Sequence, residues 1–267
     1  MRVAKVLKQA DNTKNISESG LVSSKQRGIH PHLDKSVQRH LQTTWAQPLH
    51  TPTLETFNQL KQEGVLTAGL PFILDSGCGT GSSTRQLGEL YPQYIVIGVD
   101  RSRTRLAKSG VSSSFYRDGN LVLLRAELAT LWRLLLNDGH LPDKHFLLYP
   151  NPWPKPGHLL RRWHAHPVFP QLLSLGGEIE MRCNWEVYAL EFARAVSIAS
   201  GVDVSAKRFQ PDTGMTPFER KYLEREQALF EVKIPAQLTQ DFRLSRPASH
   251  VADYSSSVFS TGGGVKR

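Results

Sequence analysis

Cysteine is scarce in this sequence, since the 267 residues contain only Cys78 and Cys183. These two residues lie far apart and match no zinc-binding or redox-active spacing, which excludes such a motif and fits a reducing compartment. Long hydrophobic runs are also missing, because no apolar stretch approaches the about 18 residues that a membrane-spanning helix needs. The basic start, MRVAKVLKQADNTKN, lacks the apolar centre of a secretory signal. These absences predict a cytoplasmic protein.

Acidic residues are outnumbered, with 24 Asp and Glu against 33 Lys and Arg and a formal net charge of +9. Such an excess indicates a polyanionic partner, above all a nucleic acid, although a merely basic protein without such a partner fits the charge equally well. A hydrophobic content of 39% is enough for a real core. The length suits one sizeable α/β domain with extensions, or at most two small domains.

Polar composition separates the two ends of the chain from its centre. Residues 1–28 are rich in Ser, Lys, Asn and Gln, which predicts a flexible basic arm. Residues 239–267 contain SRPASH, SSSVFS and TGGG, which predicts a disordered tail. We expect a single folded domain over residues 29–238.

The start of that domain is rich in histidine, which raises the question of a metal site. The four residues concerned are His30, His32, His40 and His50. No cysteine or carboxylate cluster completes a ligand set around them, so we expect no metal ion.

Apolar strands and amphipathic helices alternate along the central part of the chain. Strands are expected at residues 71–75, 94–99, 121–124, 145–149 and 177–181, and helices at 53–63, 82–90, 128–136 and 185–199. This alternation predicts a doubly wound, Rossmann-like α/β fold with a mostly parallel sheet.

A glycine cluster separates the first predicted strand from the helix after it. Its members follow a G-x-G-x-G pattern and are Gly77, Gly79 and Gly81. Bare backbone at a helix N-terminus lets a ligand lie close. Asp75 precedes the glycines, where a carboxylate can meet an amine or a sulfonium, and Asp100 ends the second strand, where it can accept hydrogen bonds from ribose hydroxyls. Glu127 follows the third strand, where it can lie beside an adenine. NAD and S-adenosylmethionine both fit such a site, and the glycine spacing and the preceding acid favour the methyl donor.

Prolines alternate with other residues after the strand at 145–149. They are Pro150, Pro152, Pro154 and Pro156, within the stretch LLYPNPWPKPGHLLRRWHAHPVF. Proline fixes φ and removes a backbone donor, so neither a helix nor a strand continues through this run. We expect a stiff loop that holds Asn151, Trp153 and Lys155, followed by a basic segment with Arg161 and Arg162. A polar loop at the carboxyl end of a strand is where an open α/β protein binds its substrate.

Several stretches resemble a known family. YPNPWPKPGHLLRRW is similar to the signature F-P-D-P-W-x-K-x-R-H-x-K-R-R of the bacterial tRNA (guanine-N7)-methyltransferases. CNWEVYA and TPFER are similar to the family's T-D-W-x-x-Y-A and T-K-F-E-x-R, and DSGCGTG resembles motif I of class I S-adenosylmethionine-dependent methyltransferases. These blocks occur in family order over residues 70–235.

The resemblance implies a class I methyltransferase fold, S-adenosylmethionine as cofactor, and methylation of N7 of a variable-loop guanine in tRNA. We expect the protein to be either a monomer or a homodimer, and the sequence does not distinguish these. It places Asp75, Asp100, Glu127 and Asn151 at the cofactor and the active centre, with Asn151 in the catalytic position. It places the following residues at the substrate: Lys155, Asn184, Thr216, Pro217, Phe218 and Glu219.

Guanine chemistry suggests roles for the substrate residues. The N7 lone pair lies in the ring plane, so methylation needs no deprotonation, and the enzyme must supply alignment and stabilise a purine that becomes cationic. A carboxylate such as Glu219 can accept both N1–H and the N2 amino group. Lys155, Arg161 and Arg162 would then hold phosphate. Trp153 and Trp163 either stack on a base or pack beneath the loop, and packing is preferred for Trp153.

The sequence departs from the family pattern at the substrate side. Asn151 replaces the family's aspartate in P-D-P-W, and Cys183-Asn184 replaces its T-D pair. Gly157 and Leu160 replace basic residues of the signature. Two alternatives to guanine methylation therefore stay open: a methyltransferase of this family with another substrate, and a catalytically weak paralogue that binds RNA.

Overall fold

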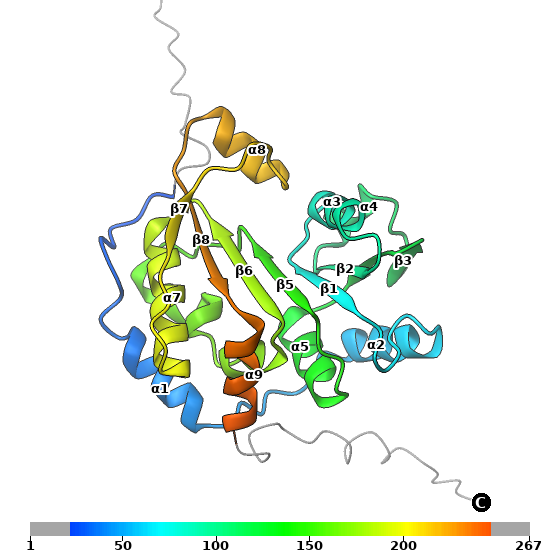
Figure 1. Ribbon diagram of the computed structural model, residues 1–267, viewed down its shortest axis with the longest axis horizontal. Coiled ribbons are helices and arrows are strands. Elements are labelled where there is room, and N and C mark those ends of the chain that lie inside the picture. Colours follow the sequence, from blue (N-terminus) through cyan, green and yellow to red (C-terminus); the bar gives the residue numbers. More distant parts are fainter. Residues whose placement is uncertain (1–21, 247–267) are drawn as a thin grey trace, which may run out of the picture.

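The computed structural model describes residues 22–246, which form a central sheet with helices on both faces (Figure 1). The strands are β1 (Phe72–Ser76), β2 (Ile95–Asp100), β3 (Phe115–Asp118), β4 (Leu121–Arg125), β5 (Lys144–Leu148), β6 (Glu178–Cys183), β7 (Lys207–Phe209) and β8 (Leu229–Ile234). They lie side by side in the order β3-β4-β2-β1-β5-β6-β8-β7. The five strands from β4 to β6 in this order are parallel, whereas β3, β7 and β8 pair antiparallel with their neighbours. The predicted doubly wound, mostly parallel sheet is confirmed.

Helices cover the sheet and connect its strands. They are α1 (Leu33–Gln42), α2 (Thr51–Gln62), α3 (Ser82–Leu90), α4 (Arg103–Ala107), α5 (Leu128–Asn137), α6 (Phe169–Leu175), α7 (Glu186–Ser200), α8 (Pro217–Glu224) and α9 (Ala236–Ser245), with 3-10 turns η1 (Pro156–Arg161) and η2 (Trp163–Ala165). No helix of residues 22–246 has the length and apolar character to span a bilayer.

The core follows the period of two that a strand imposes on its side chains. Alternate residues of β1 show it: Leu74 belongs to the large cluster around Trp132 of α5, whereas Ile73 packs with Leu87 of α3. Both faces of the central strands are therefore buried, as expected for parallel strands between two helical layers.

The strand order places a topological switch point between β1 and β5. From β1 the chain proceeds outward through β2 to β4, and from β5 it proceeds the other way through β6. In open α/β sheets the carboxyl ends of the strands at such a point form the ligand-binding crevice. In Figure 1 this is the upper edge of the sheet, with α8 on one side and α3 and α4 on the other.

The predicted boundaries of arm and tail need correction. Residues 239–245, expected in the tail, belong to α9, where Thr239 and Phe242 are buried. At the other end, Ser24 and Gln26, expected in the arm, are hydrogen-bonded to the folded body. Residues 1–21 and 247–267 lie outside the described part of the chain.

Candidate functional site

Asp75, near the end of β1, is a buried carboxylate with one oxygen engaged. Its Oδ2 accepts hydrogen bonds from the hydroxyls of Ser83 at 2.6 Å and Thr84 at 2.8 Å, both in the first turn of α3. Its Oδ1 is buried and has no hydrogen-bond partner among residues 22–246. Burial raises the pKa of Asp75 to about 6, against the lowering effect of the two hydroxyls. The free oxygen is an acceptor that a cationic or N–H-bearing ligand can use.

The glycine loop, Ser76–Gly81, has the backbone that its sequence predicts. Gly77, Gly79 and Gly81 have φ angles of +88°, +62° and +72°, a region that side-chain-bearing residues rarely adopt. At Gly81 a Cβ would also lie 2.8 Å from Cδ2 of Leu123. The loop therefore requires glycine and leaves bare backbone at the N-terminus of α3.

Asp100, at the end of β2, joins the glycine loop to the next turn. Its Oδ2 accepts from the backbone N–H of Gly79 at 3.0 Å, and its Oδ1 accepts from that of Ser102 at 2.7 Å. Arg105 of α4 pairs with Oδ1 at 3.2 Å. Since β1 and β2 are adjacent, the structure brings Asp75, the glycines and Asp100 together at one edge of the sheet.

Glu127 lies on the same edge, and its carboxylate caps a helix. β4, which ends two residues before Glu127, pairs with β2. The carboxylate accepts from the backbone N–H groups of Ala129 at 3.1 Å and Thr130 at 2.7 Å, which satisfies the first turn of α5. Contact of Glu127 with an adenine stays a prediction.

The proline loop, Tyr149–Lys155, leaves β5 through two unusual backbone positions. Tyr149 has φ of +53° and Trp153 has φ of +45°. Non-glycine residues in this region cost about 1 to 3 kcal/mol each and cluster at functional sites. Between them Asn151 is exposed, and its Oδ1 accepts from the backbone N–H of Trp153 at 3.2 Å. The loop thus presents the Asn151 side chain at the carboxyl edge beside β1.

The structure contradicts the expectation that Arg162 holds phosphate. Its side chain is completely buried and pairs with Glu191 of α7 at 2.5 Å, between Nη1 and Oε2. Its Nε and Nη2 donate to the carbonyl of Trp153 at 3.3 and 3.2 Å. Because the guanidinium is enclosed and fully used, Arg162 fastens the proline loop to the core and is not available to a substrate.

Glu191 is the centre of this buried cluster. It accepts from Nε2 of His164 at 2.9 Å, from the side chain of Gln26 at 2.6 Å and from the backbone N–H of His30 at 2.9 Å. Burial alone would raise the pKa of Glu191, but the hydrogen bond from His164 and the charges of His164 and Arg162 lower it to about 2. Segment 22–30 is thereby held against the proline loop, where Ser24 also donates to the carbonyl of Pro154 at 2.6 Å.

Glu219, expected to accept from a guanine, is fully buried. Its Oε1 accepts from the hydroxyl of Tyr149 at 2.8 Å and from Nη1 of Arg182 at 3.0 Å, and its Oε2 accepts from the backbone N–H of Met215 at 2.5 Å. Thr216 caps α8 by accepting from the N–H of Glu219 at 3.0 Å. In this structure Glu219 anchors α8 beside the proline loop and presents no face to a base, so the predicted direct contact is corrected.

Other predicted substrate residues lie at the surface of this region. Lys155 and Arg161 are exposed, and the Arg161 guanidinium lies 4.8 Å above the ring of Trp153. Pro217 and Phe218 form the exposed first turn of α8, and Phe218 stacks on Tyr222 with ring centroids 6.3 Å apart. The proposed contacts of these residues with the substrate stay predictions.

Asn184 and the two tryptophans are packed to different degrees. Asn184 is half-buried, and its amide nitrogen donates to Oε1 of Gln227 at 3.1 Å. Trp163 packs against Trp132 with ring centroids 4.7 Å apart, so it belongs to the core. Trp153 is half-buried and lies beneath Arg161, which agrees with packing under the loop.

Tyr149, Arg182 and Glu191 hold the site together and were not among the predicted residues. No local pattern singles them out, because the contacts through which they hold the site join residues 27 or more positions apart in the sequence. The pairing of Arg182 with nearby Glu180 does not distinguish it from an ordinary strand arginine. The one signal is a carboxylate, Glu191, on the face of α7 that carries Tyr188 and Phe192.

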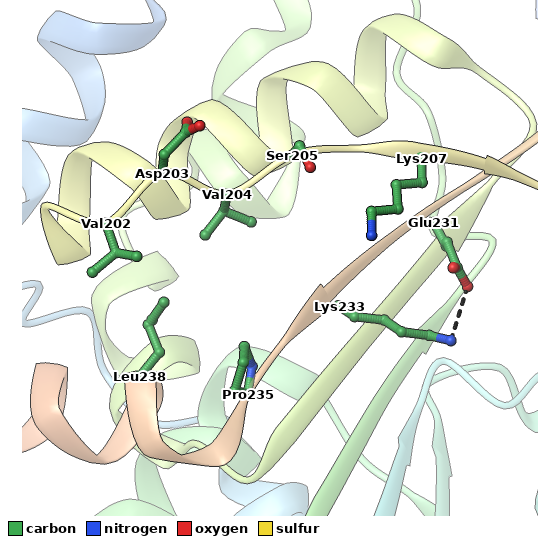
Figure 2. Close-up of a pocket in the computed structure, with 9 residues that line it drawn as sticks. All are labelled: Val202, Asp203, Val204, Ser205, Lys207, Glu231, Lys233, Pro235 and Leu238. Atoms are coloured by element: carbon green, nitrogen blue, oxygen red, sulfur yellow. Dashed lines mark ion pairs between the residues drawn. The ribbon is translucent and has the colours of Figure 1, made fainter.

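A surface hollow lies elsewhere, between the segment after α7 and the start of α9 (Figure 2). It is lined by Val202, Asp203, Val204, Ser205, Lys207, Glu231, Lys233, Pro235 and Leu238. Its charges are mixed, and Lys233 pairs with Glu231 at 3.2 Å. It includes none of the predicted site residues, and the described residues contain no cluster of metal-ligating side chains.

Comparisons with known proteins identify the family of the chain. A protein family described as "Putative methyltransferase" matches residues 70–232. A tRNA (guanine-N(7)-)-methyltransferase of Pediococcus pentosaceus is 26% identical over 172 residues, which are 61% of this chain and 80% of that protein. The corresponding enzyme of Chromobacterium violaceum is 24% identical over 176 residues, 64% of this chain and 77% of that protein.

The solved structures that match this chain include a 16S rRNA (adenine(1408)-N(1))-methyltransferase from Catenulisporales acidiphilia. It is 17% identical with a TM-score of 0.42, and the match covers 72% of this chain and 96% of that one. A structure described as an antibiotic-related methyltransferase is 16% identical with a TM-score of 0.46, covering 73% and 98%.

Proposed function

Since the chain belongs to the methyltransferase family that matches residues 70–232, we propose that it transfers a methyl group from S-adenosylmethionine to N7 of a guanine in tRNA. The observation that carries the proposal is the joint placement of Asp75, Asp100 and Asn151 around the carboxyl ends of β1, β2 and β5. The variable loop is the part of tRNA that the family resemblance indicates.

The cofactor side fits S-adenosylmethionine by its donor and acceptor set. The unpartnered Oδ1 of Asp75 suits the ammonium group of the methionine part, because a buried carboxylate gains most from a charged donor. The bare backbone of the glycine loop allows close approach, and Asp100 suits the ribose hydroxyls. When bound, S-adenosylmethionine supplies an electrophilic methyl group on sulfur.

The substrate side needs to position a base rather than to remove a proton. Guanine N7 attacks through a lone pair that is already free, so a general base is not required, and Asn151 cannot act as one. Exposed Asn151 offers an amide at the point where the base must lie, with its backbone fixed between Pro150 and Pro152. The residue roles are therefore alignment and hydrogen bonding, with the cations Lys155 and Arg161 beside them for phosphate.

Tyr149 and Glu219 set the geometry of the site from beneath. Glu219 accepts from Tyr149, where the proline loop begins, and from the backbone of Met215, just before α8. This carboxylate consequently links the loop that carries Asn151 with the helix that carries Phe218. Its contribution to the reaction is to hold these two surface elements at a fixed separation.

Methyl transfer is tested with the purified chain, labelled S-adenosylmethionine and unmodified tRNA, followed by nucleoside analysis. The expected product is 7-methylguanosine, which should be lost when a tRNA lacking the variable-loop guanine is supplied. Absence of 7-methylguanosine at saturating enzyme would overturn the proposal.

A second candidate function is methylation of a different RNA position by the same cofactor site. The observation that favours it is the pair Asn151 and Asn184, since both are amides where the family signature carries acids. An amide offers donors as well as one acceptor, which suits a different base edge. The same nucleoside analysis separates the two, because a labelled nucleoside other than 7-methylguanosine would support the second.

A further inference from the structure

Exposed cations from three separate segments converge on the α4 side of the site. They are Arg85 on α3, Arg101, Arg103 and Lys108 on and around α4, and Arg125 at the carboxyl end of β4. We call this group the α4 patch. Figure 1 shows α3 and α4 together on the side of the upper edge opposite α8.

Hydrogen bonds and strand pairing bring these segments together. Nη2 of Arg85 donates to the carbonyl of Ser109 at 3.4 Å, which joins α3 to the turn after α4. The hydroxyl of Ser109 in turn donates to the carbonyl of Thr80 in the glycine loop. In the sheet Arg125 is the register partner of Asp100, so the end of β4 lies beside the start of the α4 turn. The α4 patch is therefore a tertiary feature that borders the cofactor side.

The positive charge of the α4 patch is not balanced locally. Residues 101–117 contain Arg101, Arg103, Arg105, Lys108 and Arg117 and no acid. Arg103 and Lys108 form no ion pair with any residue of the described range 22–246. The adjacent carboxylates are engaged, since Asp100 holds Gly79 and Ser102, and Glu127 caps α5.

The opposite edge of the sheet shows how this chain balances charge where no anion is needed. There Lys144 pairs with Glu178 at 2.6 Å, and Lys61 pairs with Asp138 at 2.8 Å. A cation surface left unpaired beside the site thus differs from an ordinary solvated face, in which cations and acids alternate.

We propose that the α4 patch binds the phosphate backbone of the substrate RNA on the side of the site away from the proline loop. This inference rests on the proposed function. Arg and Lys side chains from three segments can neutralise several successive phosphates without reading sequence. With Lys155 and Arg161 on the proline loop, RNA would be held on both sides of the point of methyl transfer. Arg105 is left out of the patch because it pairs with Asp100.

The test compares two double variants that each remove two exposed cations. R103Q/K108Q alters the α4 patch, and K35Q/R39Q alters α1, which lies at the opposite end of the molecule in Figure 1. The affinity for unmodified tRNA is measured by fluorescence anisotropy between about 50 and 200 mM salt, the range over which phosphate contacts dominate. We expect R103Q/K108Q to reduce the slope of log K against log salt by about 1.4 to 1.8, and K35Q/R39Q to reduce it by less than half of that.

Control variants and cofactor binding show whether a change in slope comes from lost charge or from lost folding. R103K/K108R keeps the charges and should keep the wild-type slope, and calorimetric binding of S-adenosylmethionine should be unchanged in R103Q/K108Q. If that variant does not fold, K108Q alone should lower the slope by about half as much. Equal slopes for the patch and α1 variants would overturn this inference and leave the proposed function standing. A wild-type chain that binds no tRNA would overturn both.

Discussion

The glycine loop and the proline loop border the same site, but they are held in different ways. Asp75 accepts from Ser83 and Thr84, eight and nine positions ahead, and Asp100 accepts from Ser102, two positions ahead, and from Gly79, 21 positions before it. The proline loop is held by Arg162 and Glu191, 29 positions apart, and by Ser24, 130 positions from its partner. The two carboxylates of the first side thus use partners within 21 positions of the sequence, whereas the proline loop depends on contacts that span up to 130 positions.

This difference predicts how each side fails. A substitution at one of the loop's glycines should remove ligand binding while the fold survives, because residues 76–81 take part in none of the ion pairs of the described residues 22–246. A substitution in the cluster that holds the proline loop should unfold or loosen the protein before any effect on chemistry is seen, since its charges are buried and mutually paired.

Glu191→Ala should have the largest effect. It leaves the guanidinium of Arg162 buried without its carboxylate, and breaking a buried pair costs about 3 to 5 kcal/mol of unfolding free energy. Urea unfolding measures the loss, and Glu186→Ala, at an exposed position on the same helix, is the control, with an expected change below about 1 kcal/mol. Equal losses in the two variants would show that the cluster does not hold the fold.

The same cluster gives a dependence on acid. The pKa of Glu191 is lowered in the folded chain to about 2, so its contribution to stability is present above its ordinary value of 4.5 and is lost as the pH falls toward 2. Glu191→Gln should flatten this part of the pH–stability curve. An unchanged curve in the variant would assign the acid sensitivity to other groups.

Asp75→Asn should weaken S-adenosylmethionine binding by about 1.5 to 3 kcal/mol, the range for a hydrogen bond to a charged group, with a much smaller loss of stability. Calorimetry measures the affinity. Ser83→Ala is the matched control, because it removes one hydrogen bond to Oδ2 and leaves the free Oδ1 in place. A loss in Ser83→Ala as large as that in Asp75→Asn would mean that the free oxygen is not the ligand contact.

The raised pKa of Asp75 gives the sign of a pH effect on the same binding. Ionised Asp75 is the form that attracts an ammonium group, and with a pKa of about 6 it is lost as the pH falls below that value. Affinity in the wild type should therefore fall by up to tenfold for each further pH unit. Asp75→Asn should lack this inflection.

The sequence predicts the glycine-loop side of the site better than the proline-loop side, and the reason is physical. The strands 71–75 and 94–99 were placed within a residue of β1 and β2, and the glycines with their positive φ were identified, because each depends on its own stretch of chain. The roles given to Arg162 and Glu219 were wrong, because the same residue types suit a phosphate or base contact and a buried ion pair. Only the positions of Glu191 and Arg182, distant in sequence, decide between these.

The antiparallel strands show the same limit. β7 and β8 were not predicted, since neither is marked by a turn that would pair it with a neighbour, and β8 lies between β6 and β7 although it comes last in the sequence. Likewise residues 239–245 of α9 are predicted to lie in a tail on polar composition, whereas the burial of Thr239 and Phe242 makes them part of the folded body.

Restoring the aspartates of the family signature tests how the site binds its base, and it leaves the buried cluster around Glu191 unchanged. Asn151→Asp with Asn184→Asp should raise kcat/KM for guanine methylation of tRNA by about tenfold, which corresponds to about 1.4 kcal/mol, because a carboxylate stabilises a purine that becomes cationic. Asn151 is exposed and Asn184 half-buried, so stability should change little. Either single variant should give an intermediate rate. No gain in the double variant would favour the candidate with a different methylated position.

Arg161→Ala should have the smallest effect on stability and activity. Its comparison with Arg162→Ala separates a residue that contacts RNA at the surface from one that holds the proline loop to the core. The two arginines are adjacent, yet Arg161 is exposed above Trp153 and Arg162 is fully buried. Arg161→Ala should leave unfolding free energy within about 0.5 kcal/mol of wild type. It should lower the salt slope of tRNA binding by about 0.7 to 0.9, the contribution of one phosphate contact. Arg162→Ala should instead lower the urea midpoint strongly, and any loss of tRNA binding should follow from that. If Arg161→Ala left the salt slope unchanged, the phosphate contact would have to come from Lys155 alone, and the proline loop would hold RNA by fewer charges than its sequence suggests.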